Sequence, residues 1–162
     1  MLRPLEPEDL ELLYTIENDA AMWDVSCRTA PLSRYHLRDY IASNSSDIFH
    51  DGQVRYVIEE DGKACGLLDI FSFEPLHNRA ELGIVLLREA RGKGIAQRAI
   101  AEACALCHDR IHLHQVYAVV PDDNIASREL FLNSGFSIVA TLPQWFFDGS
   151  EHHDAIIFQH IL

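Results

Sequence analysis

The chain is poor in basic residues, in cysteine and in long apolar runs, and each shortage excludes a class of protein. Only 13 Lys and Arg face 25 Asp and Glu, so the formal net charge is −12, which argues against nucleic acid as a partner. No apolar run approaches the length of a membrane span, so we expect no membrane partner. The four cysteines fit a reducing compartment.

The sequence also shows no sign of several domains or of export. It shows no repeat, linker or low-complexity tract, and its composition is ordinary, with 48% hydrophobic and 23% charged residues. A single domain spanning residues 1–162 is the simplest organisation. The N-terminus has no charged-then-apolar leader, so we expect a cytoplasmic location.

No convincing metal site is present. Cys104 and Cys107 with His108 match the c-type haem attachment pattern, but such attachment needs an exported chain. The two thiols lie in an Ala-rich helical pattern, where small buried thiols are ordinary core residues. A zinc site would need further ligands at workable spacing, and we interpret His152 and His153 as a surface turn. We therefore expect no metal.

Hydrophobic periodicity gives a coarse order of elements. Strands are expected at 1–5, 54–60, 64–74, 79–87, 115–120, 136–147 and 154–161, with an interruption of the sixth at Pro143. Helices are expected at 8–19, 33–49, 94–110 and 124–134. Asp61-Gly62 predicts a tight hairpin turn. This alternation indicates an α/β (α+β) protein, a mixed sheet with helices on both faces.

The most informative stretch is the glycine-rich turn at residues 91–96 (RGKGIA), between an expected strand and an expected helix. A turn of this kind leaves main-chain N–H groups unpaired at the start of the helix, and the positive end of the helix dipole adds to them. The result is an anion site. The triphosphate-loop and Gly-x-Gly-x-x-Gly spacings are absent, so neither nucleotide motif applies.

Basic residues gather around this turn, although the chain as a whole is acidic. The cations are Arg88, Arg91, Lys93 and Arg98, against Glu89 alone. A phosphate-bearing ligand would explain them, and a turn with a solvated charged rim is the alternative. After the turn, one apolar stripe recurs every four residues, as in an amphipathic helix: Ile95, Ala99, Ala103 and Cys107.

A second informative segment follows the strand expected at 115–120. It reads as a short helix capped by Asp123 or Asn124 and ended near Gly135, after which Phe136 enters a strand. The spacing Asn124-x-x-Ser127 stands at its start.

Together the two segments resemble the GCN5-related N-acetyltransferases, whose Gln/Arg-x-x-Gly-x-Gly/Ala loop is followed by Asn-x-x-Ala/Ser and then Gly-Phe. The likeness covers nearly the whole chain, including residues 2–5 and 8–10. Residues 77–81 (HNRAE) and 157–160 (IFQH) look most like the polyamine (spermidine) branch. Ribosomal-protein alanine N-acetyltransferases are close relatives of that branch.

The resemblance implies a mixed, mostly antiparallel sheet of about seven strands, splayed between the fourth and fifth. It implies transfer of an acetyl group from acetyl-coenzyme A to a primary amine. The loop amides would hold the pyrophosphate, the strand end would pair with the pantetheine arm, and an N–H near Leu86 would face the oxyanion. The implied cofactor-binding residues are Val85, Leu86, Arg91, Gly92, Lys93, Gly94, Ile95, Ala96, Asn124 and Phe131.

Glu81 is the candidate general base, acting directly or through water. It lies in an otherwise apolar strand, where a carboxylate is costly without a partner or a purpose. Burial would raise its pKa toward values useful for proton transfer. The alternatives are an ion pair with Arg79 or Arg88, or a solvent-facing position.

The general acid departs from the family pattern. Many relatives carry a tyrosine four residues before the glycine of Gly-Phe, whereas this chain has Phe131, which has no proton to give. We expect Ser127 to relay a proton or to hydrogen-bond to the sulfur, with a surface serine as the alternative. Tyr117 is a weaker candidate.

The sequence is compatible with several acceptors. The leading hypothesis is a small amine, such as the polyamine spermidine. The alternatives are a protein N-terminus or a lysine as the acceptor, or a non-catalytic module that binds acyl-coenzyme A. Polyamine enzymes carry an acidic pair before a proline, but the matching stretch here is Arg28-Thr29-Ala30-Pro31, so no regulatory polyamine site is implied. Aromatic residues such as Trp23 could wall the acceptor pocket. The chain could also form a homo-oligomer.

Overall fold

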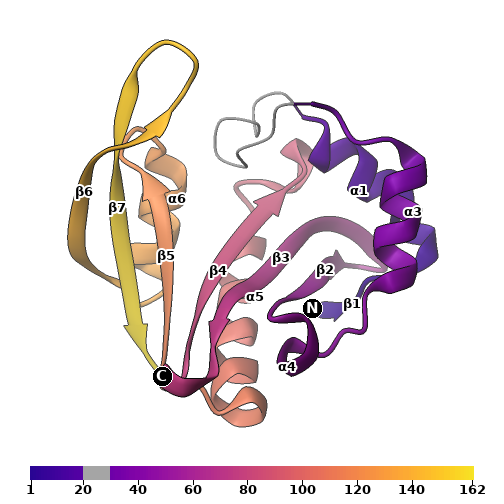
Figure 1. The fold of residues 1–162 in the computed structure, drawn as a ribbon, viewed down its shortest axis with the longest axis horizontal. Coiled ribbons are helices and arrows are strands. Elements are labelled where there is room, and N and C mark those ends of the chain that lie inside the picture. The colour runs from indigo at the N-terminus through magenta and orange to yellow at the C-terminus, as the bar shows by residue number, and fades with distance from the viewer. Residues whose placement is uncertain (20–29) are drawn as a thin grey trace.

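Seven strands form one sheet in the order β1-β2-β3-β4-β5-β7-β6 in the computed structural model, which describes residues 1–19 and 30–162 (Figure 1). The strands are β1 (Leu2–Pro4), β2 (Val54–Glu60), β3 (Lys63–Glu74), β4 (Arg79–Leu86), β5 (Gln115–Pro121), β6 (Ser137–Phe147) and β7 (His152–Ile161). Every neighbouring pair is antiparallel except β4 and β5, which are parallel. The predicted mixed, mostly antiparallel sheet is confirmed.

Helices cover both faces of this sheet, as expected. They are α1 (Leu10–Glu17), α3 (Arg34–Ser43), the short α4 (Ile48–Asp51), α5 (Ile95–Leu106) and α6 (Ile125–Asn133). In Figure 1, α5 and α6 lie behind the sheet, whereas α1 and α3 lie beside each other on the opposite side. In the described ranges, no helix is long and apolar enough to cross a membrane.

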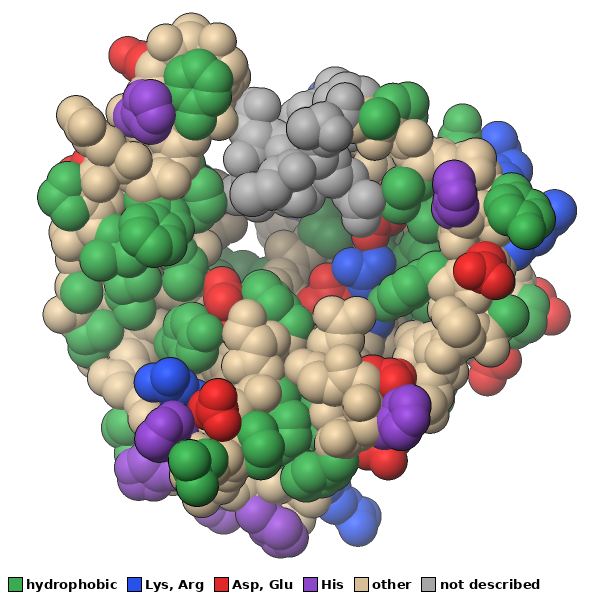
Figure 2. Space-filling view, in the orientation of Figure 1, with side chains coloured by type: hydrophobic (Ala, Val, Ile, Leu, Met, Phe, Trp, Pro, Cys, Tyr) green, Lys and Arg blue, Asp and Glu red, His purple; other side chains and the backbone are tan. Residues whose placement is uncertain are grey.

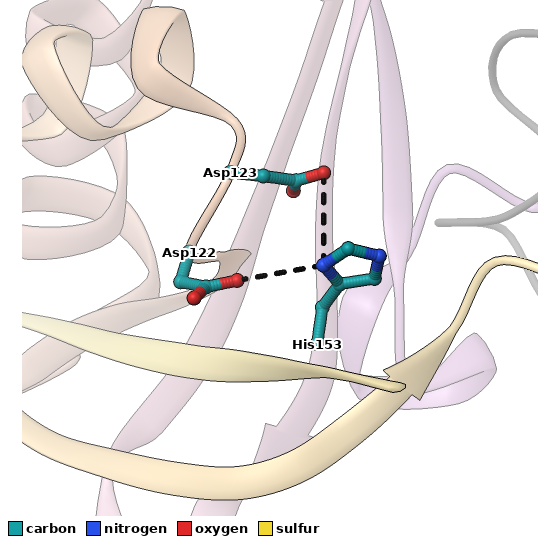
Figure 3. A group of neighbouring side chains, drawn as sticks. All are labelled: Asp122, Asp123 and His153. Carbon is teal, nitrogen blue, oxygen red and sulfur yellow. Dashed lines mark ion pairs between the residues drawn. The ribbon is translucent and has the colours of Figure 1, made fainter. Parts of the chain in front are cut away.

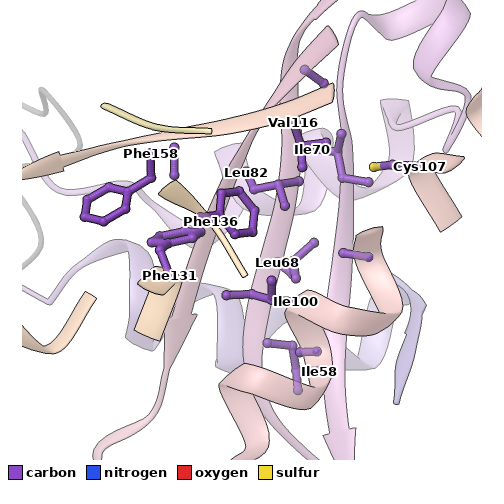
Figure 4. Packing of buried hydrophobic residues seen from close by; sticks show 14 of the residues in the cluster. Ile58, Leu68, Ile70, Leu82, Ile100, Cys107, Val116, Phe131, Phe136 and Phe158 are labelled. Carbon is purple, nitrogen blue, oxygen red and sulfur yellow. The ribbon is translucent and has the colours of Figure 1, made fainter. Parts of the chain in front are cut away.

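Two apolar cores occupy the two faces. The larger joins the sheet to α5 and α6 and includes Leu68, Ile100 and Phe158 (Figure 4). The smaller joins Val57 and Leu67 to α1 and α3. All four residues of the predicted stripe are buried, at 6% exposure or less: Ile95, Ala99 and Ala103 lie in α5, and Cys107 begins the helical turn that follows it. Burial raises the pKa of the Cys107 thiol to about 12, as expected for a core cysteine.

Two boundaries differ from the sequence prediction. The helix expected at 33–49 divides into α3 and α4, because Ser46 adopts a positive φ of 56° and the Asp47 side chain caps a new helix start. The interruption expected at Pro143 is instead a bulge within β6, next to Gln144 with φ of 53°. An edge strand tolerates proline there, because no neighbour needs its missing N–H. The Asp61-Gly62 hairpin turn is confirmed, with φ of 50° and 74°.

A buried ion-pair network ties α1 to the sheet. Arg55 Nη1 lies 2.5 Å from Glu17 Oε1, and Arg55 Nε lies 2.6 Å from Asp69 Oδ1. The three side chains are only 19%, 9% and 29% exposed. Such a network holds elements in register, and removing one partner leaves uncompensated buried charge.

Candidate active site

The central feature is the point where β4 and β5 separate. The two strands pair only at Arg79 with Gln115, Ala80 with Val116, and Glu81 with Tyr117, and beyond these positions they diverge. Figure 1 shows the widening gap between the strands, and Figure 2 shows the surface hollowed between the part over β5–β7 and the part over β2–β4. The predicted splay between the fourth and fifth strands is therefore confirmed.

The glycine-rich turn lies just beyond the diverging end of β4. Gly92 and Gly94 adopt φ of 73° and 72°, a left-handed conformation that glycine adopts at little cost, and Gly94 is the N-cap of α5. Within residues 1–19 and 30–162, no oxygen accepts a hydrogen bond from the main-chain N–H groups of residues 92–97. These donors stand at the positive end of a helix dipole, so the turn can hold an anion.

The side chains around the turn divide into two groups. Arg91 Nε donates to the Leu86 carbonyl at 3.0 Å, and Arg98 bonds to the Lys93 carbonyl and forms an ion pair with Glu60. These two arginines brace the loop. Arg88 and Lys93 are exposed and form no ion pair with any residue that the structure describes, so their charges remain available to an anionic ligand.

The end of β4 presents a main-chain donor to the gap. The Leu87 N–H donates to the Cys65 carbonyl of β3 at 2.9 Å. Successive N–H groups along a strand point to opposite sides, so the N–H of Leu86 faces away from β3, toward the gap left by β5. Its position matches the predicted oxyanion donor, a role that stays a prediction.

Glu81 lies where the gap begins, and its carboxylate is half-buried. Burial raises its pKa above the usual glutamate range, although hydrogen bonds from Tyr117 and Ser72 oppose the rise. Ser72 Oγ lies 3.4 Å from Glu81 Oε2. Glu81 forms no ion pair with Arg79, Arg88 or any other described residue, so the ion-pair alternative is wrong.

The second motif supplies a capped helix. Asn124 caps α6 by accepting the Ser127 N–H at 3.1 Å, and this choice between Asp123 and Asn124 was open in the sequence. The side-chain NH2 group of Asn124 and the Ser127 hydroxyl have no hydrogen-bond partner in the described part of the chain. Both groups are therefore available for hydrogen bonds to a ligand.

Phe131 lies on the buried side of α6. Its ring is 3% exposed and packs on Phe136 and Phe158, with centroid distances of 5.1 and 5.9 Å. A ring this buried offers a ligand almost no surface. The placement argues against the predicted cofactor contact and assigns Phe131 to the core.

Carboxylates gather where β5 ends, around His153 (Figure 3). His153 Nδ1 lies 3.9 Å from both Asp122 Oδ1 and Asp123 Oδ2, and its Nε2 lies 2.9 Å from Asp148 Oδ2. The hydrogen bond to Asp148 raises the pKa of His153. The expected surface turn is wrong, because His152 and His153 begin β7. The predicted absence of a metal stays untested.

Sequence reasoning missed Ser72, because only the folded sheet brings this serine beside Glu81. The predictions that concern Trp23 and the stretch Arg28-Thr29 fall outside the described residues.

Comparisons with known proteins agree with this geometry. The acetyltransferase (GNAT) domain matches residues 1–137. Over 162 residues the chain is 30% identical to the spermidine N(1)-acetyltransferase of Escherichia coli (strain K12), covering 98% of this chain and 86% of that protein. It is 24% identical over 98 residues to the putative ribosomal N-acetyltransferase YdaF of Bacillus subtilis (strain 168), covering 60% of this chain and 54% of that protein.

Among solved structures, the spermidine N-acetyltransferase from Vibrio cholerae in complex with CoA and spermine matches with a TM-score of 0.88 at 23% identity. The match covers 99% of this chain and 94% of that one, and it establishes the shared fold. The domain match and the sequence identity to the Escherichia coli enzyme together show that this chain belongs to the GNAT acetyltransferase family.

Proposed function

We propose that the protein transfers the acetyl group of acetyl-coenzyme A to a primary amine of a polyamine, with spermidine as the leading acceptor. The observation that carries the proposal is the row of unpaired main-chain N–H groups at residues 92–97, beside a gap between parallel strands. Such a row suits a diphosphate, and the gap suits the extended pantetheine arm that joins it to the thioester.

On the side of acetyl-coenzyme A, the residues would bind the cofactor and polarise its thioester carbonyl. The amides of residues 92–97 would hold the diphosphate, with Arg88 and Lys93 adding charge, and Asn124 would reach the arm across the gap. A main-chain N–H on the side of β4 that faces the gap would stabilise the oxyanion that forms when the amine attacks the thioester carbonyl. Fixing the two reactants in this geometry supplies much of the rate.

On the acceptor side, Glu81 would remove the proton that the attacking amine must lose. Its half-buried carboxylate and raised pKa suit a base, because a carboxylate in its usual range would be too weak at neutral pH. We infer that Ser127, with an unpartnered hydroxyl at the start of α6, hydrogen-bonds to the sulfur of the thioester.

The charge distribution favours a polycationic acceptor. Asp122, Asp123 and Asp148 cluster at the end of β5, the strand that borders the gap, and the chain carries a net charge of −12. A field of this sign draws cations toward the site. The relatives named for spermidine acetylation point to the same acceptor class, whereas the relative named for ribosomal acetylation keeps a peptide acceptor as the alternative.

An acceptor panel tests the proposal. Purified protein would be assayed with acetyl-coenzyme A against spermidine, spermine, single amino acids and peptides with N-terminal alanine, following thiol release and product mass. Acetylated spermidine formed at the highest kcat/KM supports the proposal. Preference for the peptides would establish the alternative acceptor, and tight cofactor binding without any product would establish a non-catalytic module.

Asp123→Asn sharpens the acceptor test. Removing one exposed carboxylate beside the gap should raise the KM for spermidine about threefold to fivefold, the size of an exposed ion pair. Asp109→Asn, on the helical turn after α5 and paired with His108, is the matched control and should leave the KM unchanged. Equal effects of both variants would contradict a local role for the acidic cluster.

We also infer that copies of the chain associate. The edge strand β6 exposes large apolar side chains, among them Ile138, Val139 and Trp145, and such patches mark contacts with other proteins. A relative from Vibrio cholerae has been solved as a dodecamer, with a TM-score of 0.80 at 24% identity. Light scattering on the purified protein would give the mass, and a monomer at assay concentration would contradict the inference.

A further inference from the structure

The point where β4 and β5 separate holds two ionisable side chains from two strands. Glu81 and Tyr117 are the last paired residues before the gap opens, and paired residues place their side chains on the same face of a sheet. The Tyr117 phenol and the Glu81 carboxylate are neighbours across this pair of strands, and each shifts the pKa of the other. Tyr117 is the only tyrosine on either strand that borders the gap.

A bulge in β3 adds a third group. The pairing of β3 with β4 jumps from Phe71 with Glu81 to Glu74 with Arg79, so β3 carries an extra residue at this point. Within the bulge Ser72 adopts φ of 49°, an unfavourable conformation for serine, and its hydroxyl lies 3.4 Å from Glu81 Oε2. The bulge therefore directs a second hydroxyl onto the same carboxylate.

Acetyl transfer has to move one proton from nitrogen to sulfur. The amine loses a proton when its bond to the carbonyl carbon forms, and the thiolate gains one when the carbon–sulfur bond breaks. Phe131 has no proton to give, and its ring is buried among other rings. Serine hydroxyls are poor acids, so Ser127 can do little more than hydrogen-bond to the sulfur.

We propose that Glu81 and Tyr117 form a proton-transfer pair at the head of the gap, in which Glu81 takes the proton of the amine and Tyr117 gives its phenolic proton to the leaving thiolate. The inference rests on the proposed acetyl-transfer function and names the proton donor for that reaction. Ser72 is a positioning residue that holds the carboxylate toward the phenol.

The step balances without any further reactant. The amine nitrogen bonds to the acetyl carbon and loses its proton to Glu81, while the carbon–sulfur bond breaks and its electron pair stays on sulfur. Tyr117 protonates the sulfur and becomes a phenolate. The protonated Glu81 then returns a proton to the neighbouring phenolate, which restores both groups.

Among the described residues, few charged groups surround Glu81 and Tyr117. Burial and the Glu81 carboxylate raise the pKa of Tyr117, and Arg79 from β4 lowers it. From β3, Ser72 contributes a neutral hydroxyl, and from β7, Gln159 pairs with Tyr117 and carries no charge. Tyr117 is thus the titratable group that most directly affects Glu81.

The first experiment is a mutant cycle in the acetylation assay, with Tyr117→Phe, Glu81→Gln and the double variant. Each single change should lower kcat about a hundredfold or more, and the double variant should lose no more than the larger single loss, because both residues serve one proton path. Tyr56→Phe removes a half-buried phenol from the opposite face of the sheet and is the matched control. Losses that multiply would overturn the pair.

The second experiment does not depend on activity. The Glu81 carboxyl would be titrated by NMR with carbon-labelled glutamate in the wild type, Tyr117→Phe and Ser72→Ala. Both hydroxyls lower the pKa of Glu81, so each removal should move its titration to higher pH, and the acidic limb of kcat/KM should move with it. Folding of each variant would be checked by its thermal transition.

The outcomes separate this inference from the function on which it rests. If Tyr117→Phe keeps kcat within about threefold while the wild type acetylates spermidine, the pair is wrong and the function stands. If the wild type acetylates no amine, the proposed function fails, and an unchanged Glu81 titration in Tyr117→Phe would still overturn the pair. A Ser127→Ala variant with a larger kcat loss than Tyr117→Phe would assign the proton donation to Ser127.

Discussion

Replacing Gly94 by aspartate should abolish binding of acetyl-coenzyme A while leaving the protein folded. Gly94 caps α5 at φ of 72°, and a Cβ built there would lie 3.4 Å from Arg98 Nη1, a contact that a flexible side chain can relieve. The expected cost to stability is therefore the backbone strain alone, roughly 1–2 kcal/mol. The carboxylate would stand among the N–H groups of residues 92–97, where it repels a diphosphate and competes for its donors.

The expected loss of affinity follows from those donors. A hydrogen bond to a charged group contributes about 1.5–3 kcal/mol, so losing two of them costs about 3–6 kcal/mol. Each 1.4 kcal/mol is about a factor of ten in the dissociation constant, which places the loss at a hundredfold or more. Calorimetric titration with acetyl-coenzyme A would measure it. S-acetylpantetheine, which lacks the diphosphate, should bind the variant and the wild type alike.

Gly62→Asp is the matched control. Gly62 has φ of 74° and no atom within 4 Å of a built Cβ, so aspartate there carries a similar strain at the hairpin between β2 and β3, remote from the loop. It should shift the thermal transition as Gly94→Asp does and leave the affinity unchanged. Gly94→Ala introduces the strain without the charge, so its affinity for the cofactor should lie between those of Gly94→Asp and Gly62→Asp. If Gly94→Asp bound the cofactor within about threefold of the control, the loop amides would not be the diphosphate site.

Three further outcomes follow from burial and charge. Glu81→Gln should slow acetyl transfer about a hundredfold or more, yet stabilise the fold at neutral pH. Burial raises the pKa of Glu81 in the folded state above its pKa in the unfolded state, so the stability of the wild type falls as the pH rises between these two values. Urea denaturation of the wild type and of Glu81→Gln across this pH range would show the difference. Arg55→Met should lower the free energy of unfolding by about 3–5 kcal/mol, because it removes the guanidinium that pairs with two partly buried carboxylates, and an unchanged urea midpoint would contradict that account. Gly66→Ala should cost about 1–3 kcal/mol, since its Cβ would lie 2.4 Å from a β4 carbonyl oxygen, and a wild-type thermal transition would exclude that close approach.

The sequence could predict the elements because their signals are local. The four-residue stripe on α5, the Asp61-Gly62 turn and the cap of α6 each depend on neighbouring residues alone, and all three are confirmed. The break between α3 and α4 was missed, because the helical periodicity of the flanking residues outweighed the capping signal of Asp47. Pro143 signalled an irregularity, but only the sheet order shows that β6 is an edge strand that absorbs it as a bulge.

The site was predictable where it is made of main chain and less so where it is made of side chains. The glycines at 92 and 94 indicate their left-handed conformations directly, so the loop could be placed from the sequence. Glu81 stood out as a carboxylate in an apolar strand. Its partners could not be found, because the register of β5 and the bulge at Ser72 are set by contacts between distant segments. Phe131 occupied a motif position, but the burial of its ring became visible only in the fold.

The most direct test of the account is an amide NMR titration of the wild-type protein with coenzyme A and, separately, with pantetheine. Coenzyme A should shift the N–H signals of residues 92–97 most strongly, and pantetheine should shift signals along β4 and β5 while leaving those of residues 92–97 in place. Shifts at residues 92–97 of equal size with both ligands, or none with coenzyme A, would contradict the claim that these main-chain donors hold the diphosphate.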